Sequence, residues 1–312
     1  EKIYVASQWK LMWLHFRRHK VAMVGLAFVS FMYLISILHG FVAPYDKMTR
    51  FGTRVFLPPT RIHFYDGEKV SLRPFVYGVK QGLDPTKKFR VFSEDQNVKY
   101  PIHFFVQGDK YRFLGLFDAN LHLYGVEKGG LVALLGTDSL GRDVFSRIMY
   151  GSAISLSIGL LGVIFSFVLG ATLGGISGYY GGVTDTIIQR IIEFLMSVPT
   201  IPLWISLSAA VPVNWPPTKV YFMITLILSL AGWCGLARIV RSKLLELREE
   251  DYVMAARLAG ASSGQIIGRH LLPSTMSYLI VHMTLAIPGM MLGETALSFL
   301  GLGLRNPVVS WV

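Results

Sequence analysis

Charged residues and cysteine are both scarce in this 312-residue chain. Asp, Glu, Lys and Arg together make up only 16% of the sequence and hydrophobic residues 52%, a balance too apolar for a soluble domain of this length. The single cysteine, Cys234, lies inside an apolar run, so neither an intrachain disulfide nor a cysteine zinc site can form. The sequence therefore predicts an integral membrane protein.

Acidic residues are fewer than basic ones, which gives a formal net charge of +11. Basic residues that flank membrane spans are the ordinary cause of such a balance in an apolar chain, so nucleic-acid binding is not expected. Two enzyme signatures are also missing. No Gly-Lys-Ser/Thr follows the glycines of residues 148–177, which excludes a phosphate-binding loop there, and no His-Glu-x-x-His zinc motif occurs. Ser298 near Glu294 is weak evidence for an intramembrane enzyme, because serine is common in spans.

Uncharged runs divide the chain into predicted segments. Residues 1–20 mix basic and aromatic side chains and predict either a cytoplasmic amphipathic helix or a plain positive flank. Residues 21–43 carry no Asp, Glu, Lys or Arg and are long enough to cross a hydrocarbon core of about 30 Å, so they predict a first span that leaves the cytoplasm. Residues 148–312 are expected to form a core with further spans at 148–177, 186–211, 220–237 and 271–293. Pro199 and Pro202 predict a kink in the third span.

Residues 44–147 predict a small, mostly β extracytoplasmic insert. Two stretches, Tyr65–Glu68 and Val106–Asp109, have the composition of hairpin turns between runs of aromatic and β-branched residues. The insert ends in Leu135–Arg147, where Thr137 or Asp138 is expected to cap a short helix and Arg142 to pair with Asp143 at the membrane edge.

A cytoplasmic loop, residues 238–272, separates the fourth and fifth predicted spans. Its charges have both signs, which is typical of a surface that docks another protein. Ala255, Ala256 and Gly260 predict a short helix that ends in a tight turn, and Pro273 opens the next apolar run. Small side chains on such a helix allow a partner to approach closely.

The order of these motifs resembles the permease subunits of bacterial ABC importers, in particular the dipeptide/oligopeptide (peptide/nickel/opine) family. The Ala-Ala pair, Gly260 and the Leu272-Pro273 step have the spacing of that family's coupling loop, in which the loop helix inserts into a groove of an ATPase subunit. Leu135–Arg147 looks like the segment before the second span, and Gly178–Asp185 matches a Gly-Tyr-x-Gly-Gly-x-x-Asp link. Met254 and His270 depart from the general pattern, which has glutamate and isoleucine there.

The resemblance implies roles for three groups of residues. ATPase coupling is expected at Tyr252, Ala255, Ala256, Arg257, Gly260, Leu272 and Pro273. Thr137, Asp138, Gly141, Arg142 and Asp143 are expected to shape the outer mouth or gate of the pathway, or else to contact the substrate or binding protein directly. Glu294 lies in the family's Glu-Thr-Ala-Leu-Ser-Phe-Leu-Gly segment. There it either lines the pathway with Ser298 and Phe299 or braces the segment that follows.

The same resemblance implies a fold and an activity. The fold is an all-α polytopic membrane protein of the type I ABC importer permease class, with five of six spans visible in a chain that is expected to be clipped at its ends. The activity is ATP-driven import across a bacterial or archaeal cytoplasmic membrane, with no cofactor or metal in this chain. ATP and Mg would be bound by two partner ATPase subunits, and a second homologous permease and a solute-binding protein would complete the assembly.

Two alternatives stay open at this point. The first is an importer of the same family that carries oligosaccharides or another non-peptide solute. The second is an ion-coupled secondary transporter or channel that uses Glu193, His282 or Glu294 for coupling, which would be expected to show inverted repeats.

Overall fold

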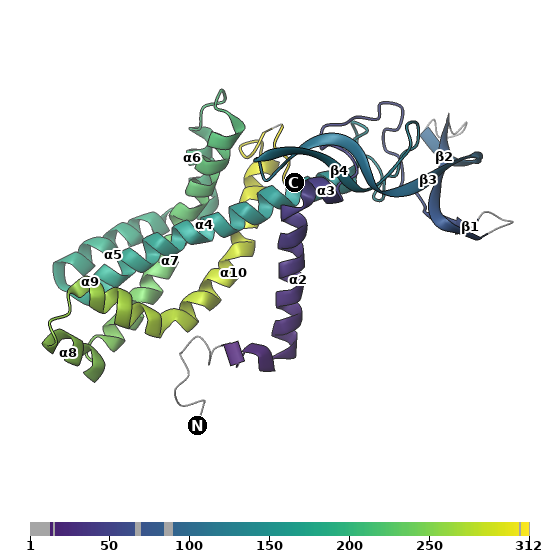
Figure 1. Ribbon diagram of the computed structural model, residues 1–312. Helices are drawn as coiled ribbons and strands as arrows, with labels where there is room; N and C mark the ends of the chain where they lie inside the picture. Colours follow the sequence, from purple (N-terminus) through teal and green to yellow (C-terminus); the bar gives the residue numbers. More distant parts are fainter. Residues whose placement is uncertain (1–12, 15, 66–69, 84–89, 306, 312) are drawn as a thin grey trace. The chain divides into compact units, whose positions relative to one another are not determined.

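The computed structural model describes residues 13–14, 16–65, 70–83, 90–305 and 307–311. The chain divides into two compact units, Glu1–Ala153 and Ile154–Val312. The strands belong to the first unit, and the helices from α5 onward belong to the second (Figure 1). Most of the predicted N-terminal amphipathic segment, residues 1–20, lies outside the described residues.

The first unit begins with an apolar helix. The predicted first span, residues 21–43, is divided between α2 (Lys20–Ile37) and the single turn α3 (His39–Val42). Most side chains of α2 are exposed in the isolated chain, as expected for a helix whose partner is lipid.

The insert of the first unit is an antiparallel sheet with the order β1-β2-β3-β4. Its strands are β1 (His63–Tyr65), β2 (Val70–Leu83), β3 (Arg90–Phe113) and β4 (Phe117–Val126). Val76, Ile102, Tyr124 and Val132 form a buried cluster in the unit. The predicted β insert is thus present.

One of the two predicted hairpins is confirmed and the other is wrong. β1 and β2 pair antiparallel on either side of residues 66–69, with Tyr65 opposite Val70, although those four residues lie outside the described part. Residues 106–109 instead lie within β3. The pairing with β4 shifts between Gln107 and Tyr111, and a Cβ on Gly108 would come within 2.7 Å of His122 Cδ2. The glycine therefore serves a bulge with a close approach.

The turn between β3 and β4 lies further along the chain. Phe113 pairs with Phe117, and between them Leu114 and Gly115 have φ values of +49° and +73°. Gly115 has the left-handed conformation that glycine adopts without strain, whereas Leu114 adopts it at a cost.

The second unit is helical. α4 (Val144–Tyr180) begins in the first unit and continues here, followed by α5 (Gly182–Ser197), α6 (Thr200–Ala209) and α7 (Pro217–Leu247). Then come α8 (Asp251–Leu258), α9 (Ser263–Gln265), a π-helical turn η1 (Ile266–Leu271) and α10 (Leu272–Phe299). Ile158 of α4, Leu228 of α7 and Met290 of α10 belong to one buried cluster.

Four helical segments among the described residues are long and apolar enough to cross a membrane: Lys20–Ile37, Val144–Tyr180, Pro217–Leu247 and Ser263–Phe299. The number is five if α5 and α6 count as one broken span. That pair is bent by 86° at Val198-Pro199, so the predicted kink is confirmed as a full break, because proline cannot continue the hydrogen-bond ladder of α5.

A stripe of glycines on α4 packs against α7. A Cβ on Gly170 would lie 2.8 Å from the Leu236 side chain, and one on Gly178 would lie 2.7 Å from the Arg241 carbonyl oxygen. At Gly174 an added Cβ would overlap the backbone of Ala237. The missing side chains at these positions therefore let α4 and α7 pack closely.

Candidate functional site

The predicted coupling helix is α8, and its end has a specific backbone form. Gly260 has φ +81°, and its N–H donates to the Arg257 carbonyl at 3.0 Å while Ala261 N–H donates to the Ala256 carbonyl at 3.0 Å. This pair of bonds is the Schellman motif. No atom lies within 4 Å of a Cβ added to Gly260, so glycine is needed there for its backbone conformation rather than for space.

Only one side of α8 is buried in this chain. Val253 is 0% exposed and joins a cluster with Val240 of α7 and Ile266 of η1. The rest of the helix is open: Leu258 is 90% exposed, Met254 45% and Tyr252 41%, and Ala255 is exposed as well. We call Tyr252, Met254, Ala255, Ala256 and Leu258 the α8 face, although Ala256 is only partly exposed.

The remaining predicted coupling residues hold α8 and the helix that follows. The Arg257 guanidinium lies 5.3 Å from the centre of the Tyr179 ring at the end of α4, which is a cation–π contact. Ser262 and Gln265 form a capping box after the turn. Leu272 packs on the same cluster as Val253. Pro273 directly follows the π-helical turn inside the continuous helical segment Ser263–Phe299, where proline cannot donate a backbone hydrogen bond.

The sequence reasoning missed a polar cluster near α8. Arg241 of α7 donates from Nε and Nη2 to the two carboxylate oxygens of Asp185 of α5, each at 2.5 Å. Ser177 of α4 donates to Asp185 Oδ1 at 2.5 Å and accepts from Gln189 Nε2 at 3.1 Å. We call Ser177, Asp185, Gln189 and Arg241 the α4–α5–α7 clamp. It connects these three helices close to the end of α4 that contacts Arg257 of α8.

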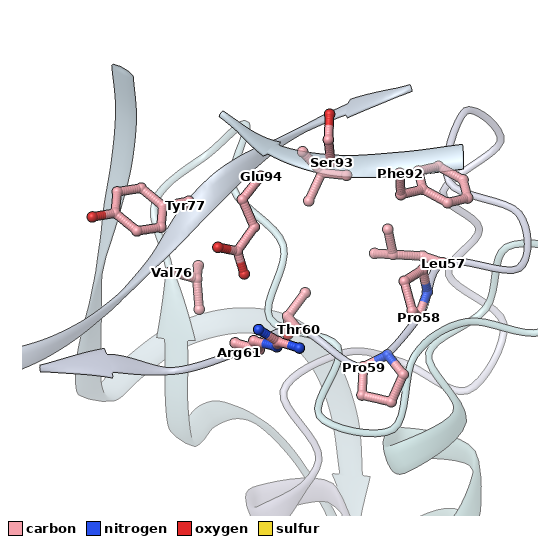
Figure 2. A pocket seen from close by; sticks show the side chains of 11 residues that line it. Leu57, Pro58, Pro59, Thr60, Arg61, Val76, Tyr77, Phe92, Ser93 and Glu94 are labelled. Atoms are coloured by element: carbon pink, nitrogen blue, oxygen red, sulfur yellow. The ribbon is translucent and has the colours of Figure 1, made fainter. Parts of the chain in front are cut away.

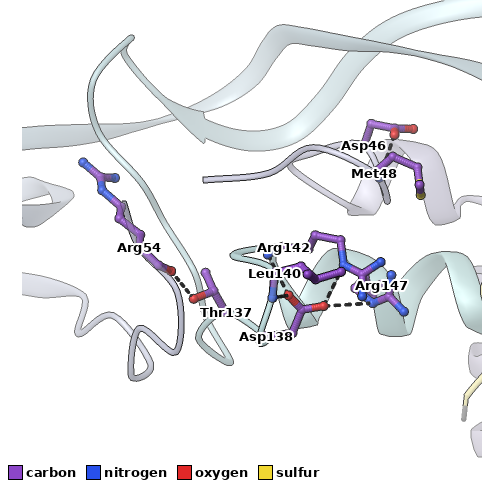
Figure 3. Close-up of polar contacts among 8 residues, drawn as sticks. All are labelled: Asp46, Met48, Arg54, Thr137, Asp138, Leu140, Arg142 and Arg147. Carbon is purple, nitrogen blue, oxygen red and sulfur yellow. Dashed lines mark hydrogen bonds and ion pairs between the residues drawn. The ribbon is translucent and has the colours of Figure 1, made fainter. Parts of the chain in front are cut away.

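The predicted outer-mouth segment is organised by Asp138 (Figure 3). Its Oδ1 accepts from the backbone N–H groups of Leu140 at 2.8 Å and Arg142 at 2.9 Å. Its Oδ2 accepts from Arg142 Nε at 2.7 Å and lies 3.7 Å from Arg147 Nε. Arg142 therefore pairs with Asp138, and the predicted Arg142–Asp143 pair is wrong.

Asp143 caps the start of α4, so the prediction that Thr137 or Asp138 caps a helix here is wrong. Its Oδ2 accepts from the Ser146 backbone N–H at 2.7 Å, directly before α4 begins at Val144, so Asp143 rather than Thr137 or Asp138 caps the helix. Its Oδ1 is buried without a hydrogen-bond partner in the described part of the chain. The carboxylate turns toward the N–H groups of its own helix and away from Arg142.

Thr137 and Gly141 fasten this segment to residues 51–57. The Thr137 hydroxyl donates to the Arg54 carbonyl and accepts from Leu57 N–H. Gly141 has φ +72°, and an added Cβ would overlap the carbonyl of Phe51. All five predicted outer-mouth residues thus have intramolecular contacts that explain their presence.

Burial and hydrogen bonding change the acidity of this region. Burial alone would raise the pKa of Asp138, but its hydrogen bonds and the Arg142 charge outweigh burial and hold the pKa below its ordinary value. For Asp143 burial prevails over the bonds from Ser146 and raises the pKa. Burial likewise raises the pKa of Tyr45 to about 12.

Of the third predicted group, the structure joins Glu294 and Ser298 and leaves Phe299 apart. Glu294 is 0% exposed and accepts from the Ser298 hydroxyl at 2.6 Å, and Ser298 in turn accepts from Leu304 N–H at 3.2 Å. A Cβ on Gly303 would overlap Ser298. Phe299 is 83% exposed. These contacts favour the bracing role for Glu294 and Ser298.

Two further observations concern the chemistry available. Within the described ranges, no three or more His, Cys, Asp or Glu side chains are grouped so as to hold a metal ion. Arg190 and Glu193 of α5 form a local ion pair, with Nη1 and Oε2 2.9 Å apart, and both side chains are largely solvent-exposed.

Comparison with known proteins places the chain among transport components. Residues 170–311 match a family described as binding-protein-dependent transport system inner membrane component, and residues 7–59 match the N-terminal TM domain of oligopeptide transport permease C. The dipeptide transport system permease protein DppC of Bacillus subtilis is 29% identical over 299 residues, which cover 96% of this chain and 70% of that protein.

Other relatives match over a shorter part. The oligopeptide transport system permease protein OppC of Bacillus subtilis is 38% identical over 176 residues, 56% of each chain. Among solved structures, an inward-facing MetNI methionine ABC transporter aligns with a TM-score of 0.40 at 19% identity, covering 52% of this chain and 84% of that one.

Proposed function

We propose that this chain, which belongs to the inner-membrane components of binding-protein-dependent transport systems, is the permease subunit of an ATP-driven importer and forms half of its pathway. Relatives are named as dipeptide and oligopeptide transport permeases, so peptides or similar small oligomeric solutes are the proposed cargo. An oligosaccharide importer of the same family is the alternative.

The observation that carries this proposal is the exposed α8 face. α8, in which Val253 is the one fully buried residue, leaves Leu258, Met254 and Tyr252 open to water, and exposed apolar side chains in one patch mark a protein-interaction surface. Ala255 and Ala256 add little bulk, so a groove of a partner can come close to the helix backbone. We assign the docking site of the ATPase subunits to this face. Those subunits, and not this chain, would bind ATP and Mg.

The contacts around α8 suggest how a movement would be transmitted. Arg257 touches the end of α4, and the α4–α5–α7 clamp joins that end to α5 and α7. A displacement of α8 by ATPase closure would therefore move three helices as a group. In this alternating-access scheme the exposure of the pathway changes side when that group tilts.

The remaining assignments follow from the family. We assign a type I ABC importer permease fold with a cytoplasmic N-terminus, a second homologous permease as the other half of the pathway, and a binding protein on the side of the insert. Thr137, Asp138, Gly141, Arg142 and Asp143 support the outer mouth through their own contacts. Glu294 and Ser298 brace residues 300–304.

The experiment that tests the proposal alters the α8 face. The doubly substituted Ala255→Asp, Ala256→Asp variant is expected to insert normally but to lose ATP-driven uptake of a tripeptide in proteoliposomes that contain both permeases, the ATPase subunits and the binding protein. Buried carboxylates at a docked interface are costly, so the loss should exceed tenfold. Co-purification of the ATPase subunits should fall in parallel.

A matched control lies in the same loop. Gly264→Asp adds one acidic group to α9, where nothing lies within 4 Å of the added Cβ, and should leave uptake within about twofold of the unaltered chain. Normal uptake by the Ala255, Ala256 variant, or a wild-type chain that purifies as a stable monomer without ATPase subunits, would contradict the coupling assignment.

A further inference from the structure

The insert contains a pocket that no part of the coupling scheme uses. Its volume is about 600 Å³, and it lies between residues 57–61 and the β2–β3 hairpin (Figure 2). Pockets of about 300–1,000 Å³ with mainly apolar walls and a few polar groups are typical of small-ligand sites. The lining residues are Leu57, Pro58, Pro59, Thr60, Arg61, Val76, Tyr77, Val79, Phe92, Ser93 and Glu94.

The apolar side of the pocket is rigid. Leu57 is 3% exposed and packs with Val79 and Phe92 in one core cluster, and Val76 is 1% exposed. The Thr60 hydroxyl is held by the backbone of Ala133, donating to its carbonyl and accepting from its N–H. The wall at residues 57–60 is therefore fixed before any ligand arrives.

The polar side carries one charge of each sign. Glu94 pairs with His63, with Nε2 and Oε1 3.3 Å apart, and not with Arg61. Arg61 has no hydrogen-bond or ion-pair partner within the ranges that the structure describes. Figure 2 shows the guanidinium of Arg61 and the carboxylate of Glu94 both directed into the space between the prolines and β3.

We propose that this pocket binds a short apolar peptide with free ends, the carboxylate at Arg61 and the amine at Glu94. A planar guanidinium is matched to a carboxylate, and Leu57, Val79 and Phe92 supply contact for an apolar side chain. Pro58 and Pro59 have no backbone N–H, so their wall presents carbonyl acceptors that suit the N–H groups of a peptide.

The same lining argues against a sugar. An oligosaccharide has many hydroxyl groups that need hydrogen-bonding partners. The Thr60 hydroxyl is engaged with Ala133, and the side chains of Tyr77 and Ser93 point away from the pocket in Figure 2. The site goes beyond the proposed coupling function and does not rest on it, because peptide binding is measurable without ATP.

The test is a calorimetric titration. The tripeptide Ala-Leu-Phe is added to the purified full-length chain in lipid nanodiscs, and the heat of binding is measured. The free acid is expected to bind about tenfold more tightly than its C-terminal amide, because the amide loses a charge-assisted contact. Arg61→Gln should remove that preference. Glu94→Gln removes the charge that is proposed to hold the peptide amine and should weaken binding of both forms about tenfold.

Arg73→Gln is the control, since Arg73 is exposed on β2 and does not line the pocket. It should leave the affinity unchanged. Equal affinity for acid and amide in the unaltered chain, an affinity that survives Glu94→Gln, or displacement by maltotriose at similar concentration would overturn the proposal. If the pocket instead holds a segment of the binding protein, the tripeptide does not bind and Arg61→Gln weakens the complex with that protein, which also rejects the peptide site.

Discussion

At the scale of single residues, Asp143 shows how one carboxyl can both hold a helix and cost stability. It accepts from Ser146 N–H at the start of α4, while its other oxygen is buried without a partner in the described part of the chain. Because burial raises its pKa, the folded state binds the Asp143 proton more tightly than the unfolded state does. Its favourable contribution to stability is therefore complete below the ordinary Asp pKa and is lost as pH rises through the raised value.

Asp143→Asn removes the ionisation and keeps a capping oxygen, so it is expected to raise the unfolding temperature at pH 7. The difference should shrink as pH falls toward the ordinary Asp pKa of about 3.9, where the native carboxyl is protonated. Thermal unfolding in detergent between pH 4 and 8 measures this.

Asp143→Ala serves as the comparison because it loses the cap, which costs about 1 kcal/mol. An asparagine variant that is less stable than the unaltered chain at neutral pH would show that the charge of Asp143 stabilises the fold.

Residue-level pairing was the least predictable feature of the site. The sequence suggested that Arg142 pairs with its neighbour Asp143, but the backbone turn from Asp138 to Arg142 brings the guanidinium to Asp138, four residues earlier. Adjacent residues at a helix start point in different directions, and only the turn geometry decides between the two acids.

At the scale of elements, the α4–α5–α7 clamp makes a sharp prediction. Asp185→Asn weakens the bidentate contact with Arg241, in which both groups are at most one-third exposed, and should cost about 1–2 kcal/mol of stability. If α5 must move with α7, the variant should also transport fewer peptide molecules per ATP hydrolysed. Uptake and phosphate release measured in the same proteoliposomes give that ratio.

The same helix offers a control. Arg190→Gln breaks the exposed pair with Glu193, which is worth at most a few tenths of a kcal/mol, and should leave the ratio unaltered. The exchange Asp185→Arg with Arg241→Asp should restore part of the coupling. A ratio that is unchanged in Asp185→Asn would show that the clamp is structural only.

Elements were easier to predict than their contacts. Uncharged runs located the long apolar helices, and Pro199 marked the break between α5 and α6. The Val106–Asp109 stretch was misread because a glycine at a bulge has the same composition as a glycine in a turn. The clamp joins positions 56 residues apart, and no local pattern in the sequence reveals such a pairing. The high exposure of Leu258 was equally hidden, since an apolar residue in a short helix suggests burial.

At the scale of the whole molecule, the segments that enter and leave the insert are hydrogen-bonded to each other. Thr60 N–H donates to the Ala133 carbonyl at 2.9 Å, and the Thr60 hydroxyl exchanges two further bonds with Ala133. Replacing residues 62–131 by a short Gly-Ser linker should therefore leave residues 154–312 folded and bound to the ATPase subunits. If the insert contacts the binding protein, the affinity for that protein should fall more than tenfold in a pull-down with titrated binding protein.

Arg61→Gln distinguishes the pocket from the rest of the insert. It should leave the affinity for the binding protein unchanged, because the pocket is proposed to hold a free peptide. An excised chain that binds the binding protein as tightly as the full chain would show that the insert has no part in that contact.

The glycine stripe between α4 and α7 limits which substitutions these positions can accept during evolution. Gly170 faces the Leu236 side chain, and the nearest atom to an added Cβ is Leu236 Cβ at 2.8 Å, so an alanine at 170 becomes acceptable once glycine arises at 236. Gly174 and Gly178 instead face the backbone of Ala237 and Arg241, and no exchange on α7 can withdraw a backbone atom. Positions 170 and 236 should therefore covary among descendants of this chain, while positions 174 and 178 stay glycine.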